Sequence, residues 1–142
     1  MSSHFPKVLI TGARGQLARS LALAAPPQTE VVGLERADLD ISDADAVRAA
    51  LETHQPDVVF NGAAYNLVDK AEGEGARQAL EVNALGPAVL AAACRDSGAQ
   101  LVHFSTDFVL DGRKTSPYTE DDRTNPLGVY GASKLCGENV VL

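Results

Sequence analysis

The 142-residue sequence has no tryptophan, one methionine and two cysteines, and aromatic residues make up only 5% of it. Cys94 and Cys136 lie far apart and form no Cys-x-x-Cys pair. No run approaches the ~20 apolar residues that a membrane-spanning helix needs. Met1–Pro6 lacks the basic segment and apolar run of a secretory signal. The sequence therefore predicts a cytoplasmic protein with two reduced thiols and no contact with a membrane.

Positive charge is also scarce, because 12 lysines and arginines stand against 19 acidic residues and the formal net charge is −7. No basic stripe is available to bind a nucleic-acid backbone or an anionic membrane, so neither is expected as the main partner. An anionic small ligand stays open, since local dipoles can hold one. The hydrophobic content of 45% and the length are typical of a single globular domain.

A glycine-rich turn near the start of the chain organises the rest. Residues Lys7–Thr11 favour a strand, Gly12 and Gly15 lie in the turn that follows, and an Ala/Leu-rich helix runs on to Ala24. This order can hold a diphosphate, because glycines let the backbone approach the ligand and a helix N-terminus attracts an anion. The spacing is Gly-x-x-Gly-x-x-Ala, with Ala18 small enough for close packing. The alternative is an ordinary turn.

Strand and helix patterns alternate four times along the chain, which predicts an α/β fold with a Rossmann-type doubly wound parallel sheet. Asp38–Asp40 is a candidate edge strand, which would give the order 3-2-1-4-5. Ser42 is the expected N-cap of the second helix, Pro87 should bend the third, and Tyr65–Gly75 reads as loop. The expected strands are Lys7–Thr11, Glu30–Leu34, Asp57–Asn61 and Leu101–Ser105, and the later helices are Asp43–Thr53, Ala76–Asp96 and Val129–Leu142.

Two charged residues end the second strand, about 20 residues past the glycine turn, where dinucleotide-binding proteins recognise the adenine ribose. Glu35 could accept a hydrogen bond from the 2′-hydroxyl of NAD, and Arg36 could bind the 2′-phosphate of NADP. Both are present, so the choice stays open, and either could be a solvated loop charge. The small residues Gly62–Ala64 after the third strand would let a ligand lie against the backbone, or they form a plain turn.

Tyr130 and Lys134 are four residues apart on the last predicted helix, so they share a face at about 6 Å. An ammonium beside a phenol lowers the phenol pKa, and a shift from ~10 toward 7 needs about 4 kcal/mol. Thr106, from the end of another strand, can donate to the same carbonyl oxygen. A Tyr-x-x-x-Lys pair alone is more often a surface pair; together with the glycine turn it indicates catalysis. His103 is expected to be a satisfied core histidine.

These motifs resemble the extended short-chain dehydrogenase/reductases, and within them the dTDP-4-dehydrorhamnose reductases. The Ser-Thr-Asp strand end and the Val-Asp-Lys-Ala-Glu loop separate that subfamily from nucleotide-sugar epimerases. The resemblance covers nearly the whole chain and rests on Thr11–Leu17, Asp38–Ile41, Pro56–Val59, Asn61–Tyr65, Val68–Glu72, Val82–Asn83, Ser105–Val109, Pro117–Asp122 and Val129–Glu138.

The resemblance implies an NADPH- or NADH-dependent reduction of the C4 keto group of dTDP-4-dehydro-L-rhamnose. Tyr130 would donate the proton, Lys134 would hold the nicotinamide ribose and tune Tyr130, and Thr106 would polarise the carbonyl. The implied cofactor residues are Gly12, Gly15, Gln16 and Leu17 at the diphosphate, Asp40 and Ile41 at the adenine, Ala63, Ala64 and Tyr65 along the middle, and Asn83 as support, besides Glu35, Arg36, Tyr130 and Lys134.

The chain departs from the family pattern at several places. Ala18 replaces the usual third glycine, Gly62 stands where alanine is common, and Phe108 replaces a frequent tyrosine. Some members hold magnesium at a dimer interface with an acid in the first helix. Arg19 and Ser20 occupy that turn here, so no metal is expected, and a homodimer stays open.

Relatives continue for about as many residues again, so residues 1–142 are expected to be an NAD(P)-binding Rossmann domain, truncated before the last strands and the substrate domain. The chain is then either a fragment of a reductase or a naturally shortened relative that binds cofactor without turning over substrate, and its activity alone stays open. The alternatives are a non-catalytic NADP-binding regulatory subunit, and a nucleotide-sugar epimerase or dehydratase that recycles a tightly held NAD.

Overall fold

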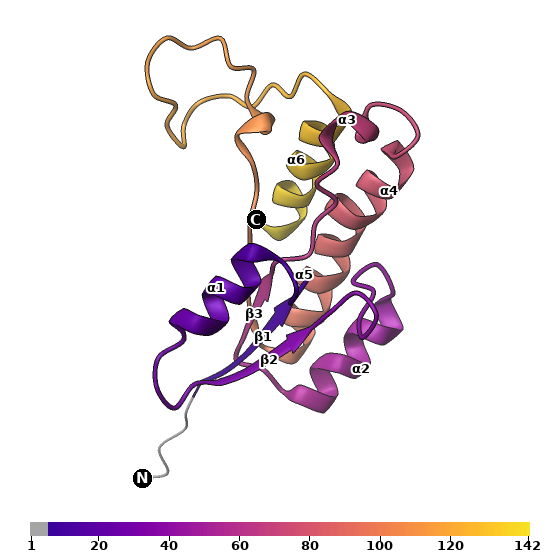
Figure 1. Cartoon of the computed structure of the whole chain (residues 1–142), viewed down its shortest axis with the longest axis vertical. Helices are drawn as coiled ribbons and strands as arrows, with labels where there is room; N and C mark the ends of the chain where they lie inside the picture. The colour runs from indigo at the N-terminus through magenta and orange to yellow at the C-terminus, as the bar shows by residue number, and fades with distance from the viewer. Residues whose placement is uncertain (1–5) are drawn as a thin grey trace.

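A computed structural model describes residues 6–142 and shows a parallel sheet between two layers of helices (Figure 1). The prediction that the N-terminus is not a secretory signal concerned Met1–Pro6, and residues 1–5 lie outside the part that the structure describes. The strands β1 (Lys7–Thr11), β2 (Glu30–Leu34), β3 (Val58–Asn61) and β4 (Gln100–His103) pair in the order β2-β1-β3-β4. All three pairings are parallel. The predicted Rossmann-type sheet is therefore confirmed, and each strand lies within one or two residues of its expected bounds.

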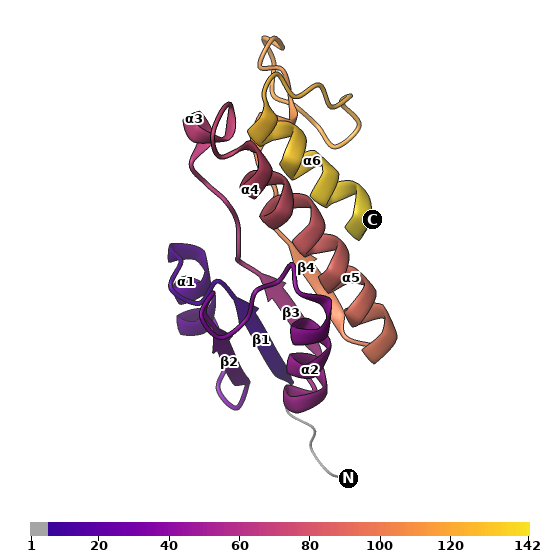
Figure 2. The ribbon, with the colours of Figure 1, turned by 90° about the vertical axis from the view of Figure 1, so that its right-hand side faces the viewer.

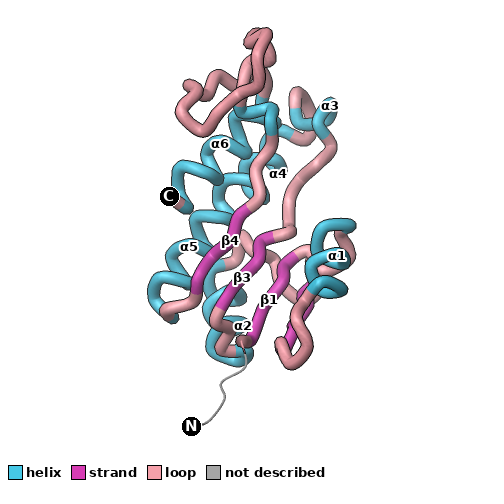
Figure 3. The backbone as a smooth tube through the Cα atoms, turned by 90° about the vertical axis from the view of Figure 1, so that its left-hand side faces the viewer, coloured by secondary structure: helices cyan, strands magenta, loops and turns pink. Residues whose placement is uncertain are grey.

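Helices cover both faces of the sheet. Helix α1 (Gln16–Ala24) lies on one face, and α2 (Ala44–His54) and α5 (Gly86–Ser97) lie on the other (Figure 2). Figure 3 shows the strands side by side, with α1 on the opposite side from α5. The last helix, α6 (Val129–Val141), packs along α5. No helix among residues 6–142 is both long and apolar enough to cross a bilayer.

The main hydrophobic core lies between the sheet and the layer of α2 and α5. Leu9 of β1 is adjacent to Val59 of β3 in the strand register, and both are fully buried. Side chains alternate along a strand, so these two residues face the same layer. The buried members of this core are Leu9, Leu39, Ile41, Val47, Leu51, Val59, Leu90 and Cys94.

The expected edge strand at Asp38–Asp40 is wrong, and the order 3-2-1-4-5 falls with it. This segment is a turn in which Asp38 Oδ2 accepts from the Glu35 amide at 2.9 Å, and the Asp38 amide donates to the Glu35 carbonyl at 3.0 Å. These local bonds satisfy backbone groups that a strand would otherwise pair. Leu39, at the end of the turn, joins the core instead of a sheet edge.

The N-cap of α2 is Asp43 rather than the expected Ser42. Asp43 Oδ1 accepts from the amides of Asp45 and Ala46, both at 3.0 Å. The Ser42 hydroxyl instead donates to Asp40 Oδ1 at 2.7 Å. Both residue types cap helices well, so their order in the sequence could not decide between them.

The long third helix is interrupted by a wider turn where a bend was expected. It consists of α4 (Ala76–Leu80), a π-helical turn η1 (Glu81–Leu85) and α5. Pro87 lies in the first turn of α5, where its missing N–H is tolerated. Gly98 ends α5 at φ 80°. The expected loop between Tyr65 and Gly75 contains a one-turn helix, α3 (Val68–Ala71).

Candidate active site

A groove of about 760 Å³ opens along the carboxyl ends of β1, β2 and β3. This edge of a parallel sheet is where doubly wound folds bind their ligands, and the volume suits a small-molecule site. Nine of the predicted cofactor residues line it: Gly12, Gly15, Glu35, Arg36, Asp40, Ile41, Ala63, Ala64 and Tyr65. The other lining residues are Arg14, Ala37, Leu39, Gly62, Asn66 and Val82.

The glycine turn forms one end of this groove. Gly12 has φ +66°, and a side chain there would lie 2.8 Å from the amide nitrogen of Ala63 and from the carbonyl oxygen of Gly62. Both its conformation and its surroundings therefore require glycine. Gly15 precedes α1, and no side chain caps that helix. The first amides of α1, which include those of the predicted residues Gln16 and Leu17, are thus oriented for an anion.

Ala18 fits the place where a third glycine is usual. It is 2% exposed, and a side-chain carbon at Gly62 would lie 3.6 Å from its Cβ, an ordinary contact distance. Helix and strand therefore pack closely around two small residues, as the sequence predicted.

The charges at the far end of the groove are arranged unequally. Glu35 pairs with Arg14, whose Nε lies 2.7 Å from Glu35 Oε1, and this hydrogen bond and charge raise the pKa of Arg14. Arg36 forms no ion pair with any described residue. The Asp40 carboxylate accepts from the amide and hydroxyl of Ser42, which lowers its pKa. Glu35 is thus paired with Arg14, while Arg36 forms no ion pair and its charge contributes to the lowered pKa of Asp40.

A chain of polar side chains crosses the ends of β1, β3 and β4. The Thr11 hydroxyl donates to Asn61 Oδ1 at 2.7 Å, and Asn61 Nδ2 donates to His103 Nδ1 at 3.1 Å. Since an amide nitrogen only donates, Nδ1 accepts and the ring proton lies on Nε2. Burial, together with the charge of Lys134, lowers the pKa of His103 to about 4.

Nε2 of His103 is buried and has no hydrogen-bond partner within residues 6–142. The prediction of a satisfied core histidine therefore holds for one ring nitrogen and is wrong for the other. The residue that faces Nε2 is Gly137 of α6. It has no side chain that could accept the Nε2 proton.

Tyr130 and Lys134 share one face of α6 and are both buried, at 8% and 3% exposure. They are not the surface pair that a Tyr-x-x-x-Lys spacing alone would favour. Lys134 Nζ donates to the Phe104 carbonyl at 2.6 Å, and burial lowers the pKa of this ammonium while Glu138 partly opposes the shift. The Tyr130 ring packs edge-to-face against Phe108, with centroids 5.5 Å apart.

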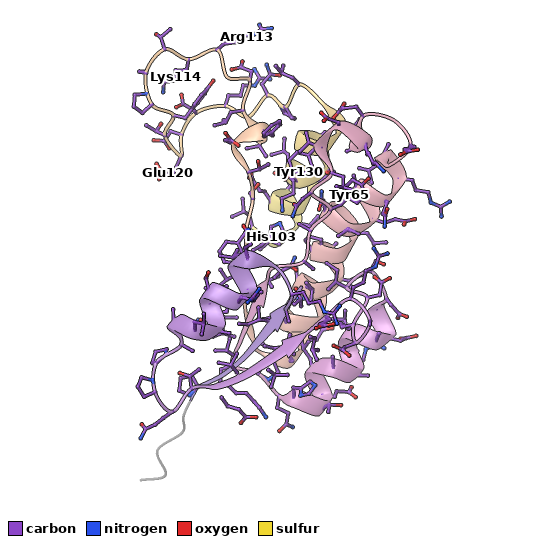
Figure 4. The ribbon with its side chains drawn as sticks, viewed as in Figure 1. Tyr65, His103, Arg113, Lys114, Glu120 and Tyr130 are labelled. Atoms are coloured by element: carbon purple, nitrogen blue, oxygen red, sulfur yellow. The ribbon has the colours of Figure 1, made fainter. Side chains whose placement is uncertain are left out.

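Figure 4 shows Tyr130 beside Tyr65, with His103 nearer the sheet. Tyr65, Ala71, Ala79 and Tyr130 form a second buried cluster. No described residue hydrogen-bonds the Tyr130 hydroxyl. The phenol therefore lies next to a residue that lines the groove, with its polar end free for a ligand.

Thr106 lies on the segment between β4 and the short 3-10 helix η2 (Asp107–Val109). Its hydroxyl donates to Asp107 Oδ1 at 3.2 Å and accepts from the Phe108 amide at 3.3 Å. The same segment contacts α6 through the Phe104 carbonyl on one side of Thr106 and the Phe108 ring on the other. Helix α6 and Thr106 are thus brought together by residues flanking Thr106.

Asn83 lies in the π-helical turn and does not line the groove. Its Oδ1 accepts from the Tyr65 amide at 2.9 Å, and its Nδ2 donates to the Tyr65 carbonyl and to Ser133 Oγ, both at 3.1 Å. It therefore joins the groove at Tyr65 to α6 at Ser133. This fits the supporting role implied by the resemblance; π-helical turns often occur at functional sites.

Arg14, Asn66 and Val82 line the groove without having been predicted as site residues. Arg14 stands inside the glycine turn, so its position in the motif could have indicated it. Asn66 and Val82 reach the groove only through the packing of η1 and the segment after β3, which no local pattern reveals.

Comparison with known proteins agrees with this geometry. The model of one family, described as RmlD substrate binding domain, matches residues 6–142. A dTDP-4-dehydrorhamnose reductase from Burkholderia thailandensis is 47% identical over 135 residues, which are 95% of this chain and 45% of the relative. The chain thus spans about half the length of the curated relatives it matches.

Solved structures give the same result. A dTDP-4-dehydrorhamnose reductase from Clostridium acetobutylicum is 45% identical with a TM-score of 0.91, covering 95% of this chain and 48% of its own. One from Bacillus anthracis, solved in complex with NADP, is 34% identical with a TM-score of 0.94, covering 99% of this chain and 50% of its own. Through residues 6–142, this chain belongs to the RmlD substrate binding domain family.

Proposed function

We propose that these 142 residues are the nicotinamide-cofactor-binding domain of a reductase that converts dTDP-4-dehydro-L-rhamnose to dTDP-L-rhamnose. The main support is that a groove with a glycine turn and a buried Tyr130–Lys134 pair occur in the same fold. Tyr65 connects them, because it lines the groove and packs in the same buried cluster as Tyr130. The names of the Burkholderia and Clostridium relatives support the substrate. The part that binds the sugar nucleotide would lie outside these residues.

The groove fits a dinucleotide by its own chemistry. The uncapped start of α1 suits a diphosphate, and the backbone of Gly12 approaches Gly62 so closely that a side chain would fill the space. Gly12, Gly15, Gln16 and Leu17 would hold the diphosphate, and the small residues Ala63 and Ala64 would face the middle of the cofactor.

The proposed cofactor is NADPH in preference to NADH. Glu35 pairs with Arg14, whereas Arg36 forms no ion pair among residues 6–142, and an arginine at this place suits a 2′-phosphate. The Bacillus anthracis relative was solved with NADP. When bound, the cofactor supplies the hydride that reduces C4 of the sugar.

The chain's own residues would manage the proton. The Tyr130 phenol donates a proton to the C4 oxygen, since no described residue occupies its hydroxyl. Lys134, held by the Phe104 carbonyl, favours the phenolate that is left behind. The Thr106 hydroxyl turns from Asp107 to the same oxygen and polarises the carbonyl.

The test uses the full-length protein with NADPH and dTDP-4-dehydro-L-rhamnose, following the absorbance of the reduced nicotinamide. Tyr130→Phe should lower kcat by about 10²–10⁴-fold, the usual contribution of a general acid, without changing NADPH binding. If the wild type oxidised NADPH and Tyr130→Phe did so at the same rate, a residue other than Tyr130 would be the proton donor. No oxidation, with stoichiometric capture of another protein, would support the regulatory-subunit alternative, and NAD retained through purification would support the epimerase or dehydratase.

The same proposal gives the protein a nucleotide sugar as substrate and the cytoplasm as its place of action. A homodimer stays a prediction, and light scattering during gel filtration would test it.

A further inference from the structure

The helix that carries Tyr130 and Lys134 has no cap within its own sequence. Its N-cap is Gly128, which has no side chain to accept from the first amides. Two of those amides donate instead to Glu72: Val129 N to Oε2 at 3.0 Å, and Tyr130 N to Oε1 at 3.1 Å. One of the two thus belongs to Tyr130 itself. Glu72 lies 58 residues earlier in the chain.

Gly128 makes room for this carboxylate. A side chain on Gly128 would lie 2.6 Å from Glu72 Oε1 and 3.0 Å from Oε2. The conformation of Gly128, φ −140° and ψ 172°, is extended and open to any residue. Close approach by Glu72, and not backbone strain, is what requires a glycine at this position.

The backbone of Glu72 is held in place by α3 and its packing. Glu72 ends the one-turn helix α3, and its amide donates to the Asp69 carbonyl at 3.3 Å. Its neighbour Ala71 is fully buried, at 0% exposure, and packs in the buried cluster with Tyr130. Figure 1 shows α3 beside the start of α6. Both the backbone and the ring of Tyr130 are therefore located by the same short helix.

A second glutamate of the same segment, Glu74, has no such role. Glu74 has 77% of its side chain exposed and faces Lys70 at 3.5 Å. It is two residues from Glu72, has the same side chain and forms no hydrogen bond or ion pair with the described residues of α6. Glu74 is therefore a matched control.

We propose that Glu72 is a positioning residue for proton transfer: by capping α6 it fixes the start of the helix and, with it, the Tyr130 phenol. This rests on the proposed function, in which Tyr130 is the proton donor. Misplacement of a reacting group by about 1 Å can lower a rate by about 100-fold. Glu72 lines no part of the cofactor groove, so we expect its loss to lower the rate of proton transfer far more than it weakens NADPH binding.

The first experiment compares Glu72→Ala, Glu72→Gln and Glu74→Gln in the full-length protein. Glu72→Ala should lower kcat by about 10- to 100-fold with the Kd for NADPH unchanged within about twofold. Glu72→Gln, which keeps one acceptor and loses the charge, should fall between it and the wild type. Glu74→Gln should match the wild type. A kcat for Glu72→Ala equal to that of Glu74→Gln would overturn the proposal.

A second pair of variants separates capping from general damage. Gly128→Ser should lower kcat in the wild type, because its side chain displaces the Glu72 carboxylate. In the Glu72→Ala background the same change should raise kcat, because a serine at the N-cap accepts from the first-turn amides. Equal losses in both backgrounds would refute the cap.

Hydrogen exchange of the Tyr130 amide gives a readout independent of turnover. It should accelerate in Glu72→Ala relative to Glu74→Gln, and slow again on adding Gly128→Ser. If the wild type oxidised no NADPH, only the proposed function would be refuted. The comparison of hydrogen exchange would still decide whether Glu72 caps α6. Unchanged exchange in Glu72→Ala would overturn the inference even in an active reductase.

Discussion

Replacing Asn83 with alanine should destabilise the protein more than any surface change of the same size. Asn83 is 1% exposed and uses its side chain for three hydrogen bonds, two to the backbone of Tyr65 and one to Ser133 Oγ. Alanine removes all three. It leaves the Tyr65 amide and carbonyl without the partners that Asn83 supplies.

The magnitude follows from the number of groups left unpaired. Three buried hydrogen bonds at about 1 kcal/mol each amount to about 3 kcal/mol. Ser133 Oγ keeps its own bond to the Tyr130 carbonyl at 2.7 Å, so it adds little. Most of this loss comes from the two orphaned backbone groups of Tyr65, and about 3 kcal/mol is a large part of the roughly 5–15 kcal/mol that stabilises a domain.

Urea unfolding monitored by circular dichroism measures this loss as a change in the free energy of unfolding. Asn139→Ala is the matched control, because Asn139 is an exposed asparagine on α6 and should change stability by less than about 0.5 kcal/mol. A loss below about 1 kcal/mol for Asn83→Ala, with an unchanged m-value, would refute the view that these bonds hold the Tyr65 segment to α6.

Three further changes test other parts of the site. Gly12→Ala should weaken NADPH binding by at least about tenfold in fluorescence titration, because the left-handed φ of +66° and the nearby Ala63 amide both oppose a side chain; wild-type affinity would contradict this. Arg36→Ala should raise the Kd for NADPH by about tenfold, a typical value for one charged hydrogen bond, and leave NADH binding unchanged; equal losses for both cofactors would refute the 2′-phosphate assignment. His103, whose pKa burial lowers to about 4, binds its proton more weakly in the folded state. The fold should therefore keep its full stability above about pH 6.5 and lose part of it as the pH falls toward 4, by at most about 3 kcal/mol before discounting for partial exposure of the ring. His103→Gln should flatten that slope in unfolding curves taken across the same pH range, and an unchanged slope would exclude the histidine as its source.

Local patterns predicted the sheet well because its strands are short apolar runs bounded by turn residues. Lys7–Thr11 and Glu30–Leu34 match the structure at both ends. The errors occur where side chains compete with the backbone for hydrogen bonds. Asp38 forms a turn through a hydrogen bond to the Glu35 amide, and Asp43 caps α2 in place of Ser42. Both outcomes depend on which of several neighbouring side-chain acceptors bonds to a given amide. Sequence alone does not rank such neighbours.

The candidate site divides in the same way. Gly12, Glu35 and Arg36 were found because their positions follow from distance along the chain to a strand end. The contacts of Asn83 and Glu72 could not be found, because they join segments 50 and 58 residues apart. Their motifs marked them as part of a resemblance, but the reason for each appears only in the folded chain.

These long-range contacts explain how a groove and a helix on different parts of the fold can act as one site. Asn83 fixes the groove backbone at Tyr65 to Ser133 of α6, and Glu72 fixes the first turn of the same helix. These bonds are made to backbone amides, to the Tyr65 carbonyl and to the Ser133 hydroxyl, and Asn83 and Glu72 both come from the segment between β3 and α5. That segment is therefore the part of the chain through which the position of a bound cofactor is related to the position of the Tyr130 phenol.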